Sequence, residues 1–336
     1  MQAILVSRHG GPEVLEPVTL ADPRPDPGQV VVRTAASGVN FIDVYRRSGA
    51  YPTALPAVPG VEAAGTVAAV GSGVAGVAVG DRVAWVNHPG AYADLVAVPA
   101  ERLVPVPDAV PLRDAAAVLL QGMTAHFLTR DTYQVRPGDT VLVHAAAGGM
   151  GLLLTQLATL RGARVIGTVS SAAKERLARL AGAAEVVRYT DTDVAAAVRE
   201  LTGGAGVAAV YDGIGAPTFD ASLACLRPRG TLAVFGQAGG RVPPIDLQQL
   251  NAAGSAFLTR PNLEHHIATR PELLDRARAV FGALAAGRLR VHVGRRYPLA
   301  AAATAHADLE RRASVGKLLL CPTGHSPITD SEGENG

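Results

Sequence analysis

The sequence predicts an α/β protein that combines a β-rich domain with a doubly wound parallel sheet. From Thr140 onward, short β-branched runs alternate with helical stretches, and parallel strands need such crossover helices. The first third is instead rich in valine, glycine and proline, with turn signals between strand-like runs. A chain of 336 residues has room for about two domains of ordinary size.

The β-rich part starts at the N-terminus, where residues 1–7 read as a strand. Further strand-like runs follow at residues 29–36, 61–70, 81–86 and 91–98. Turn signals such as Asp26-Pro27-Gly28 separate these runs, which favours a distorted barrel. Near Pro111 the pattern changes, and residues 112–130 are rich in alanine and leucine with the spacing of a helix.

Six strands are predicted for the doubly wound sheet, at residues 141–144, 165–168, 185–188, 207–211, 231–235 and 256–259. Their length and β-branched content are typical of buried parallel strands. Beyond Pro261 we expect a helix, a strand and a second helix, at residues 271–286, 289–293 and 300–311.

This pattern divides the chain into two domains and a tail. The segment after Pro261 is expected to return to the first domain, which then comprises residues 1–122 and 262–323. Residues 123–261 form the doubly wound domain. The short polar tail, residues 324–336, is expected to be disordered.

Composition and charge exclude several classes of function. No apolar run approaches the roughly 18 residues of a membrane span, and the N-terminus lacks the basic and apolar segments of a secretory signal. We therefore expect a cytoplasmic protein without a membrane partner. The net charge of +2 comes from 31 basic and 29 acidic residues spread along the chain, which does not favour a nucleic-acid partner.

Side chains that ordinarily bind zinc are sparse. The two cysteines, Cys225 and Cys321, can form neither a disulfide framework nor a four-cysteine zinc site, and we expect both to be inert thiols. The nine histidines are scattered, and the adjacent pair His265 and His266 is poorly spaced for converging on one ion. No metal site is predicted.

A glycine-rich turn follows the first strand of the parallel sheet. Residues 145–151 read Ala-Ala-Ala-Gly-Gly-Met-Gly, and a helical stretch comes directly after them. In a dinucleotide-binding loop, Gly148 lets the backbone approach a pyrophosphate and Gly151 permits close packing of helix on strand. Because the first glycine of the G-x-G-x-x-G pattern is Ala146 here, a purely structural turn of small residues is the alternative.

The end of the second parallel strand indicates which dinucleotide is preferred. Domains that prefer NAD place an Asp or Glu there to bind the ribose 2′-hydroxyl. This chain has Ser170, Ser171 and Lys174 instead, with no acid before Glu175. Hydroxyls and an ammonium group can bind a 2′-phosphate that a carboxylate would repel, so these residues favour NADPH.

Several separated motifs resemble those of the zeta-crystallin-like quinone oxidoreductases, a branch of the medium-chain dehydrogenase superfamily. They lie, in order, at residues 38–45, 59–65, 145–151, 211–213, 235–236 and 259–261. The resemblance extends over nearly the whole chain. It implies a GroES-like catalytic domain wrapped around an inserted Rossmann domain, NADPH in the cleft, a quinone as acceptor and a homodimer.

The resemblance also implies a shell of cofactor-binding residues, namely Phe41, Ile42, Asp43, Val44, Tyr45, Thr124, Gly148, Gly149, Met150, Gly151, Ser170, Ser171, Lys174, Tyr189, Gly213, Phe235, Gly236, Gln237, Ala238, Leu258, Thr259, Arg260 and Arg312. Lys174 and Tyr189 would flank the 2′-phosphate. The chain departs from the family at Ser170, where glycine is frequent, and at Met150, where valine is usual. It also has Gly213 where serine is common, which leaves that contact open.

The zinc-dependent alcohol dehydrogenases of the same superfamily are the natural competitor. Their ligands, a cysteine and the histidine of a Gly-His-Glu motif, correspond here to Asn40 and Val61. An unactivated ketone needs a Lewis acid to stabilise its developing charge, whereas a quinone is electron-poor enough to accept hydride without one. A metal-free site therefore favours a quinone.

By the same resemblance, Asn40 and Tyr45 would be the catalytic residues. Each would lie near the nicotinamide and could donate a hydrogen bond to a quinone oxygen as charge develops. Aromatic packing is an equal alternative for Tyr45. Asp43 is expected to cap the backbone or contact a ribose.

Two other functions are compatible with the sequence. An enone or alkenal reductase would use the same hydride geometry on a C=C bond. A non-catalytic NADPH-binding protein, structural or RNA-binding, is the second alternative. The chain lacks a basic stripe interleaved with aromatic residues, which weakens the RNA-binding version.

Overall fold

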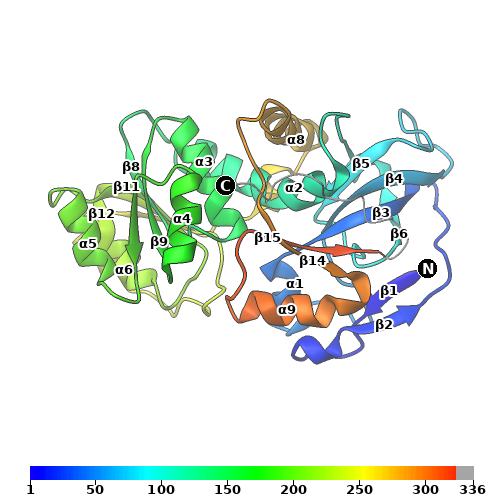
Figure 1. Ribbon diagram of the computed structural model, residues 1–336, viewed down its shortest axis with the longest axis horizontal. Coiled ribbons are helices and arrows are strands. Elements are labelled where there is room, and N and C mark those ends of the chain that lie inside the picture. The colour runs from blue at the N-terminus through cyan, green and yellow to red at the C-terminus, as the bar shows by residue number, and fades with distance from the viewer. Residues whose placement is uncertain (323–336) are drawn as a thin grey trace.

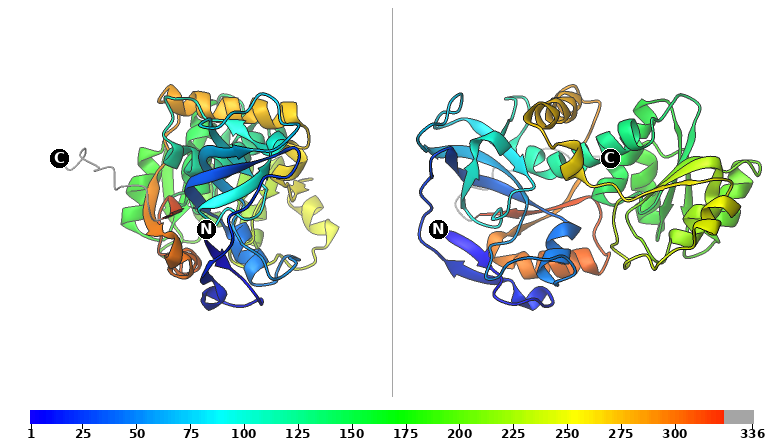
Figure 2. Two further views of the ribbon diagram at one scale, coloured as in Figure 1. Left: turned by 90° about the vertical axis from the view of Figure 1, so that its right-hand side faces the viewer. Right: turned by 180° about the vertical axis from the view of Figure 1, so that it is seen from behind.

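The computed structural model describes residues 1–322, which form two lobes that lie side by side (Figure 1). The predicted tail, residues 324–336, lies outside the described part of the chain. Seen from behind (Figure 2), one lobe holds the green and yellow middle of the chain, and the other combines the blue N-terminal and orange C-terminal segments. None of the helices within residues 1–322 has the length and apolar character that a bilayer crossing requires.

The middle of the chain forms a parallel six-stranded sheet in the order β10-β9-β8-β11-β12-β13. Its strands are β8 (Thr140–Val143), β9 (Arg164–Val169), β10 (Glu185–Arg188), β11 (Val207–Asp212), β12 (Leu226–Val234) and β13 (Phe257–Thr259). Its helices are α3 (Gly149–Leu160), α4 (Ala172–Leu180), α5 (Val194–Leu201), α6 (Phe219–Cys225) and α7 (Leu247–Ala252).

This sheet confirms the predicted α/β fold class, and each of its strands overlaps a predicted one. The strand order reverses between β8 and β11. Sheets of this kind bind ligands outside the carboxyl ends of their strands at such a switch point. The loops that follow β8, β9, β11 and β12 are therefore where a dinucleotide is expected.

The other lobe is built on a seven-stranded sheet with the path β14-β15-β3-β4-β5-β7, and β6 also pairs with β3. Its strands are β3 (Gln29–Val39), β4 (Glu62–Val70), β5 (Arg82–Val86), β6 (Leu95–Pro99), β7 (Val104–Pro105), β14 (Val293–Pro298) and β15 (Lys317–Cys321). A small separate sheet joins β1 (Gln2–Leu5) to β2 (Glu16–Thr19). The helices that accompany this lobe are α1 (Phe41–Arg47), α2 (Leu112–Phe127), α8 (Arg270–Ala285) and α9 (Ala302–Glu310).

The structure corrects the prediction at the C-terminal return. The strand expected at residues 289–293 begins only at Val293, and at Arg290 the backbone N–H and C=O are bound by the Gln156 side chain instead of a neighbouring strand. The prediction lacks β15, which pairs with both β14 and β3. Its run Lys-Leu-Leu-Leu-Cys has no alternation, as is usual for a strand covered on both faces.

Further differences lie in the N-terminal half, where the prediction also lacks β2 and β7. The strand expected at residues 91–98 forms β6 only from Leu95 onward, and Ala93 makes an isolated bridge to Ala3. The prediction also lacks α1, whose seven residues are too few to show helical periodicity. This short helix matters because it carries Phe41 and Tyr45.

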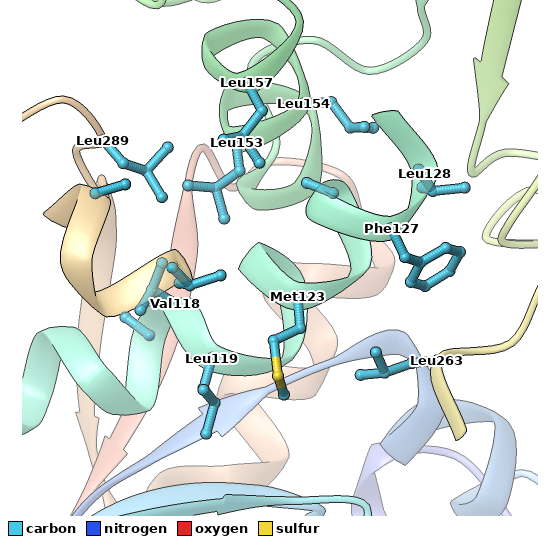
Figure 3. Close-up of a cluster of buried hydrophobic side chains, with 14 of the residues drawn as sticks. Val118, Leu119, Met123, Phe127, Leu128, Leu153, Leu154, Leu157, Leu263 and Leu289 are labelled. Atoms are coloured by element: carbon cyan, nitrogen blue, oxygen red, sulfur yellow. The ribbon is translucent and has the colours of Figure 1, made fainter. Parts of the chain in front are cut away.

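Helix α2 lies between the two lobes and packs against both. It contacts β3, β4 and β5 of the seven-stranded sheet, and α3 of the lobe that holds the parallel sheet. Figure 3 shows Val118, Leu119 and Met123 of α2 in one buried cluster with the leucines of α3. The predicted domain boundary between residues 122 and 123 falls inside this helix, which serves both lobes.

Candidate cofactor and acceptor site

The glycine loop joins the end of β8 to the start of α3, at the switch point of the sheet. Gly148 is the N-cap of α3, and a Cβ placed on Gly151 would lie 2.3 Å from the carbonyl oxygen of Ala145. Only glycine at position 151 therefore allows the helix to start this close to the strand. The N–H groups of the first turn of α3 have no acceptor within the helix, so they can bind an anion such as a pyrophosphate.

Gln121 of α2 reaches the same loop, although the sequence analysis does not single it out. A Cβ placed on Gly149 would lie 2.3 Å from Oε1 of Gln121. The Nε2 of Gln121 also donates a long hydrogen bond of 3.4 Å to Oδ1 of Asn40. No local motif marks this residue, because its position depends on how α2 crosses between the lobes.

The residues expected around a 2′-phosphate come together at the ends of β9 and β10. Ser171 is the N-cap of α4 and accepts a hydrogen bond of 3.3 Å from the N–H of Lys174. The Nζ of Lys174 donates to the carbonyl oxygen of Arg312 at 2.7 Å. Tyr189 lies beside them, since its N–H donates to the carbonyl of Val169 at 3.1 Å. Residues from both lobes therefore meet where the sequence predicts phosphate binding.

The charges at this end favour an anion. Partial burial and the neighbouring charge of Arg312 lower the pKa of Lys174. The nearest acid in the sequence, Glu175, pairs with Arg179 at 2.9 Å and with Arg188 at 3.7 Å. These two arginines compensate the carboxylate, so the ammonium of Lys174 stays available to a phosphate.

The loops after β11 and β12 lie against each other. A Cβ placed on Gly213 would be 2.8 Å from the ring of Phe235, and one placed on Gly236 would be 2.5 Å from the carbonyl oxygen of Gly213. The N–H of Ala238 donates to that same carbonyl at 3.1 Å. The departure from the family at Gly213 therefore has a steric reason, because the Phe235 ring occupies the space that a serine side chain would need.

Two hydrogen bonds join tyrosines of the first lobe to the segments that follow β12 and β13. Tyr45 of α1 accepts one of 3.0 Å at its hydroxyl oxygen from the N–H of Gln237. The guanidinium of Arg260 donates to the hydroxyl of Tyr51 at 3.1 Å. The rings of Tyr45 and Tyr51 are 5.1 Å apart, and burial raises the pKa of Tyr45 to about 12. Tyr45, Gln237 and Arg260, all expected in the cofactor shell, are thus brought together.

Asn40 is enclosed in a buried polar cluster with Glu62 and Lys317. Its Nδ2 donates to the carbonyl of Gly38 at 3.2 Å and to Oε2 of Glu62 at 2.9 Å. The ammonium of Lys317 donates to Oδ1 of Asn40 at 2.7 Å and to Oε2 of Glu62 at 2.6 Å. Asn40, Glu62 and Lys317 are each at most 4% exposed. Both amide hydrogens of Asn40 are therefore engaged within the protein.

Lys317 has no assigned role in the sequence analysis. The signal was a lysine within an apolar strand-like run, since a buried lysine is rare unless it is paired. Its partner could not be inferred, because Glu62 lies far away along the chain. Within residues 1–322, no three His, Cys, Asp or Glu side chains are arranged so that they could hold a metal ion.

Asp43 caps the start of α1. Its Oδ2 accepts hydrogen bonds from the N–H of Asn40 at 2.9 Å and from the hydroxyl of Tyr92 at 3.1 Å. Burial raises the pKa of Asp43 to about 7. The backbone-capping contact expected of Asp43 is present, and with 1% exposure the residue lies inside the wall of the lobe rather than on its surface.

The other expected cofactor residues belong to α1, α2, α3, β13 and the turn after β9, and are Phe41, Ile42, Val44, Thr124, Met150, Ser170, Leu258 and Thr259. All of them except Val44 are half-buried. They therefore keep surface that a ligand could cover.

Comparison with known families gives two matches along the chain. An alcohol dehydrogenase GroES-like domain matches residues 26–108, and a zinc-binding dehydrogenase domain matches residues 149–274. A quinone oxidoreductase from Pseudomonas aeruginosa is 45% identical over 95% of this chain and 99% of its own length. This chain belongs to the quinone oxidoreductase family of the medium-chain dehydrogenases. The resemblance based on its motifs is thereby confirmed.

Solved structures agree with this membership. A mycobacterial protein complexed with NADPH is 53% identical with a TM-score of 0.93, over 96% of this chain and 100% of that one. Escherichia coli quinone oxidoreductase complexed with NADPH is 42% identical with a TM-score of 0.94, over the same shares. A 2-haloacrylate reductase from a Burkholderia species is 43% identical over 96% of this chain and 99% of its own length. The GroES-like and Rossmann architecture is confirmed.

Proposed function

We propose that this chain is an NADPH-dependent quinone oxidoreductase that works without zinc. The observation that carries the proposal is the meeting of Ser171, Lys174 and Arg312 at the end of β9. These residues supply hydroxyl, ammonium and guanidinium groups where NAD-preferring proteins place a carboxylate. The NADPH complexes of two structurally similar proteins support the same cofactor.

The residues present fit this cofactor along its whole length. Glycine at position 151 lets α3 start close to β8, so the N–H groups of its first turn can bind a pyrophosphate. Lys174 and Arg312 would bind the 2′-phosphate, and the Tyr45 and Gln237 pair would adjoin the nicotinamide. When bound, the reduced nicotinamide supplies hydride.

The proposal of zinc independence rests on a buried cation. The family's zinc-dependent relatives use the positions of Asn40 and Val61 as ligands, yet here Asn40 and Glu62 already hold the ammonium of Lys317. A second cation placed against this ammonium would be repelled. An electron-poor acceptor such as a quinone removes the need for a Lewis acid.

Tyr45 is our candidate for direct contact with the acceptor. Its hydroxyl oxygen accepts the Gln237 N–H, so its own hydrogen stays available. A pKa of about 12 keeps the phenol protonated at neutral pH. Tyr45 therefore acts as a hydrogen-bond donor that stabilises charge developing on a quinone oxygen, rather than as an acid that gives up its proton.

Asn40 was expected to donate in the same way, and we propose a revised role for it. Both of its amide hydrogens are held by Gly38 and Glu62, so donation to an acceptor requires one of these bonds to break. Its fixed position at the N-cap of α1 instead orients the helix that carries Tyr45.

A second candidate function is reduction of an activated C=C bond. The 43% identity to a 2-haloacrylate reductase is the observation that favours it. Hydride delivery from the same cofactor would serve both reactions. Quinone reduction and C=C reduction therefore differ only in how the acceptor lies against the nicotinamide.

One set of assays tests these proposals. Initial rates of NADPH oxidation are measured with benzoquinone, naphthoquinone, 2-haloacrylate and alkenals, each with and without a zinc chelator, beside a metal assay of the purified protein. We expect the highest kcat/KM with a quinone, unchanged by chelation. Stoichiometric zinc that supports activity, or a preference for 2-haloacrylate, would overturn the corresponding part.

Three smaller expectations stay as proposals. We propose a homodimer, tested by light scattering of the purified protein, and residence in the cytoplasm, tested by cell fractionation. We also keep the domain limits of residues 1–122 with 262–323, and 123–261. Limited proteolysis that cuts near residue 261 would support the second limit.

A further inference from the structure

A chain of buried polar side chains lies at the switch point of the parallel sheet, and the proposed reaction does not use it. His144, the residue before the glycine loop, contacts Oγ1 of Thr168 through Nδ1 and Oγ of Ser222 through Nε2, both at 3.0 Å. Ser222 in turn donates to Oδ2 of Asp212 at 2.9 Å. None of these four residues is more than 4% exposed.

The partners settle the direction of each hydrogen bond. The carboxylate of Asp212 already accepts from the N–H groups of Ile214 (2.7 Å) and Gly215 (3.1 Å), so Ser222 must donate to it. The Ser222 oxygen then accepts from Nε2–H of His144, which leaves Nδ1 to accept from the Thr168 hydroxyl. Burial lowers the pKa of His144, in agreement with a neutral ring.

This arrangement is not that of a catalytic serine. The Ser222 hydroxyl hydrogen is directed at Asp212, and His144 donates to the serine instead of accepting its proton. The serine oxygen is fully buried, so no substrate can reach it. The network therefore has a structural role, and it matters because of the loops that it connects.

Three of the four members stand next to different loops of the proposed cofactor site, and Ser222 of α6 joins two of them. His144 precedes the glycine loop, Thr168 lies two residues before Ser170, and Asp212 precedes Gly213. Backbone contacts reinforce the connection, because the Ala146 N–H donates to the Thr168 carbonyl at 3.0 Å. The three loops follow β9, β8 and β11, which are neighbours in the parallel sheet. The hydrogen bonds of the sheet align these strands, but not the loops that follow them.

We propose that His144 is a positioning residue for NADPH, which fixes the mutual placement of these three loops through Thr168, Ser222 and Asp212. This inference rests on the proposed function, since it places NADPH against these three loops. His144 does not touch the cofactor. It acts through the loops, so its removal is expected to weaken binding without changing the chemistry of hydride transfer.

Two variants of His144 test the proposal. His144→Leu removes both hydrogen bonds with a side chain of similar size. His144→Gln keeps one donor and one acceptor on the same side chain. We expect His144→Leu to raise the NADPH Kd by about tenfold, as the loss of a buried hydrogen bond or two would do. The KM for quinone should stay unchanged, and His144→Gln should recover most of the affinity.

Thr168→Val and Ser222→Ala separate the two arms of the network, and they carry the test if His144→Leu does not fold. Thr168→Val frees only the loop that leads into α4 and its Lys174, so it should lower the preference for NADPH over NADH. Ser222→Ala should weaken both cofactors alike. Thr155→Val is the matched control, because Thr155 is fully buried in α3 and its hydroxyl has no hydrogen-bond partner among the described residues.

A second measurement is independent of cofactor binding. In the ligand-free protein, amide hydrogen exchange at residues 145–147 and 213–215 should be about tenfold faster in His144→Leu and restored in His144→Gln. Affinity and exchange that match the wild type in a folded His144→Leu would overturn the inference. If the wild type itself fails to bind NADPH, the proposed function falls, while the exchange data still decide whether the network orders the loops.

Discussion

Lys174 is the residue on which cofactor preference should depend most. Its ammonium lies 2.7 Å from the Arg312 carbonyl, at the place proposed for the 2′-phosphate. Lys174→Glu replaces a charge-assisted contact with repulsion, so the NADPH Kd should rise by roughly tenfold or more while that of NADH changes little. Fluorescence titration with both cofactors measures this.

Arg176→Glu is the control for that substitution. It makes the same charge change two residues further along α4, about 200° around the helix, at an exposed position. It should leave the ratio of the two Kd values unchanged. An equal loss for NADPH and NADH in Lys174→Glu would remove the assignment of the phosphate site.

Tyr45 allows its hydroxyl and its ring to be tested separately. If the hydroxyl stabilises charge on the acceptor, Tyr45→Phe should lower kcat by about tenfold or more, with the NADPH Kd within about threefold of wild type. If only aromatic packing matters, Phe keeps full turnover and only Tyr45→Ala loses it. Steady-state kinetics of the two variants distinguish these results.

Residue types with local meaning could be identified from the sequence, and residues with distant partners could not. Ser171, Lys174 and Gly151 could be placed from the sequence because their positions follow from the strand, turn and helix around them. Asn40 could be placed near the site but not given its partners, since these include Lys317 from the other end of the chain. Its hydrogen-bond capacity is therefore used in a way that local sequence does not reveal.

At the scale of elements, the sharpest prediction concerns the start of α3. A methyl group at position 151 would meet the Ala145 carbonyl at 2.3 Å. Gly151→Ala should therefore push the helix from the strand, lower the melting temperature and weaken NADPH binding by more than about tenfold. Calorimetry and titration measure the two effects.

Gly282→Ala is the matched control for that helix variant. Gly282 lies inside α8, and no atom stands within 4 Å of the position of its Cβ. Alanine there should raise stability by about 0.5–1 kcal/mol, because it restricts the unfolded chain and favours the helix. Destabilisation of both variants to the same extent would contradict the close-packing argument.

The elements that could be predicted are those whose pattern repeats several times. The parallel strands alternate with helices, so the identification of each strand is supported by the same pattern in its neighbours. Helix α1, with seven residues, and strand β15, without alternation, give no such signal. The segment at residues 289–293 was assigned by its apolar residues, yet at Arg290 the backbone is bound by the distant side chain of Gln156 instead of a strand.

At the scale of the molecule, Lys317 of β15 and Glu62 of β4 join the two ends of the chain within the seven-stranded sheet. Their ion pair is 2.6 Å long and fully buried, and Glu62 also accepts the N–H of Leu120 in α2 at 2.7 Å. Lys317→Met should lower the free energy of unfolding by about 3–5 kcal/mol, because it leaves a buried carboxylate without its cation. Urea denaturation measures this loss.

The double variant Lys317→Met with Glu62→Gln checks the cause of that loss. It removes the charge together with its partner, so much of the stability should return. A double variant as unstable as Lys317→Met alone would show that packing, rather than the uncompensated charge, is responsible.

The pairing of β15 with β3 also sets an order of assembly during synthesis. The contact between Lys317 and Asn40 spans 277 residues, whereas the parallel sheet is contiguous from β8 to β13. The Rossmann lobe can therefore fold on the ribosome while the GroES-like lobe, begun first, still lacks its closing strand. Until that strand arrives, residues 37–39 of β3 lack a partner on the edge where β6 pairs only with residues 29–33, which leaves this end of the nascent N-terminal lobe exposed to aggregation and to chaperones.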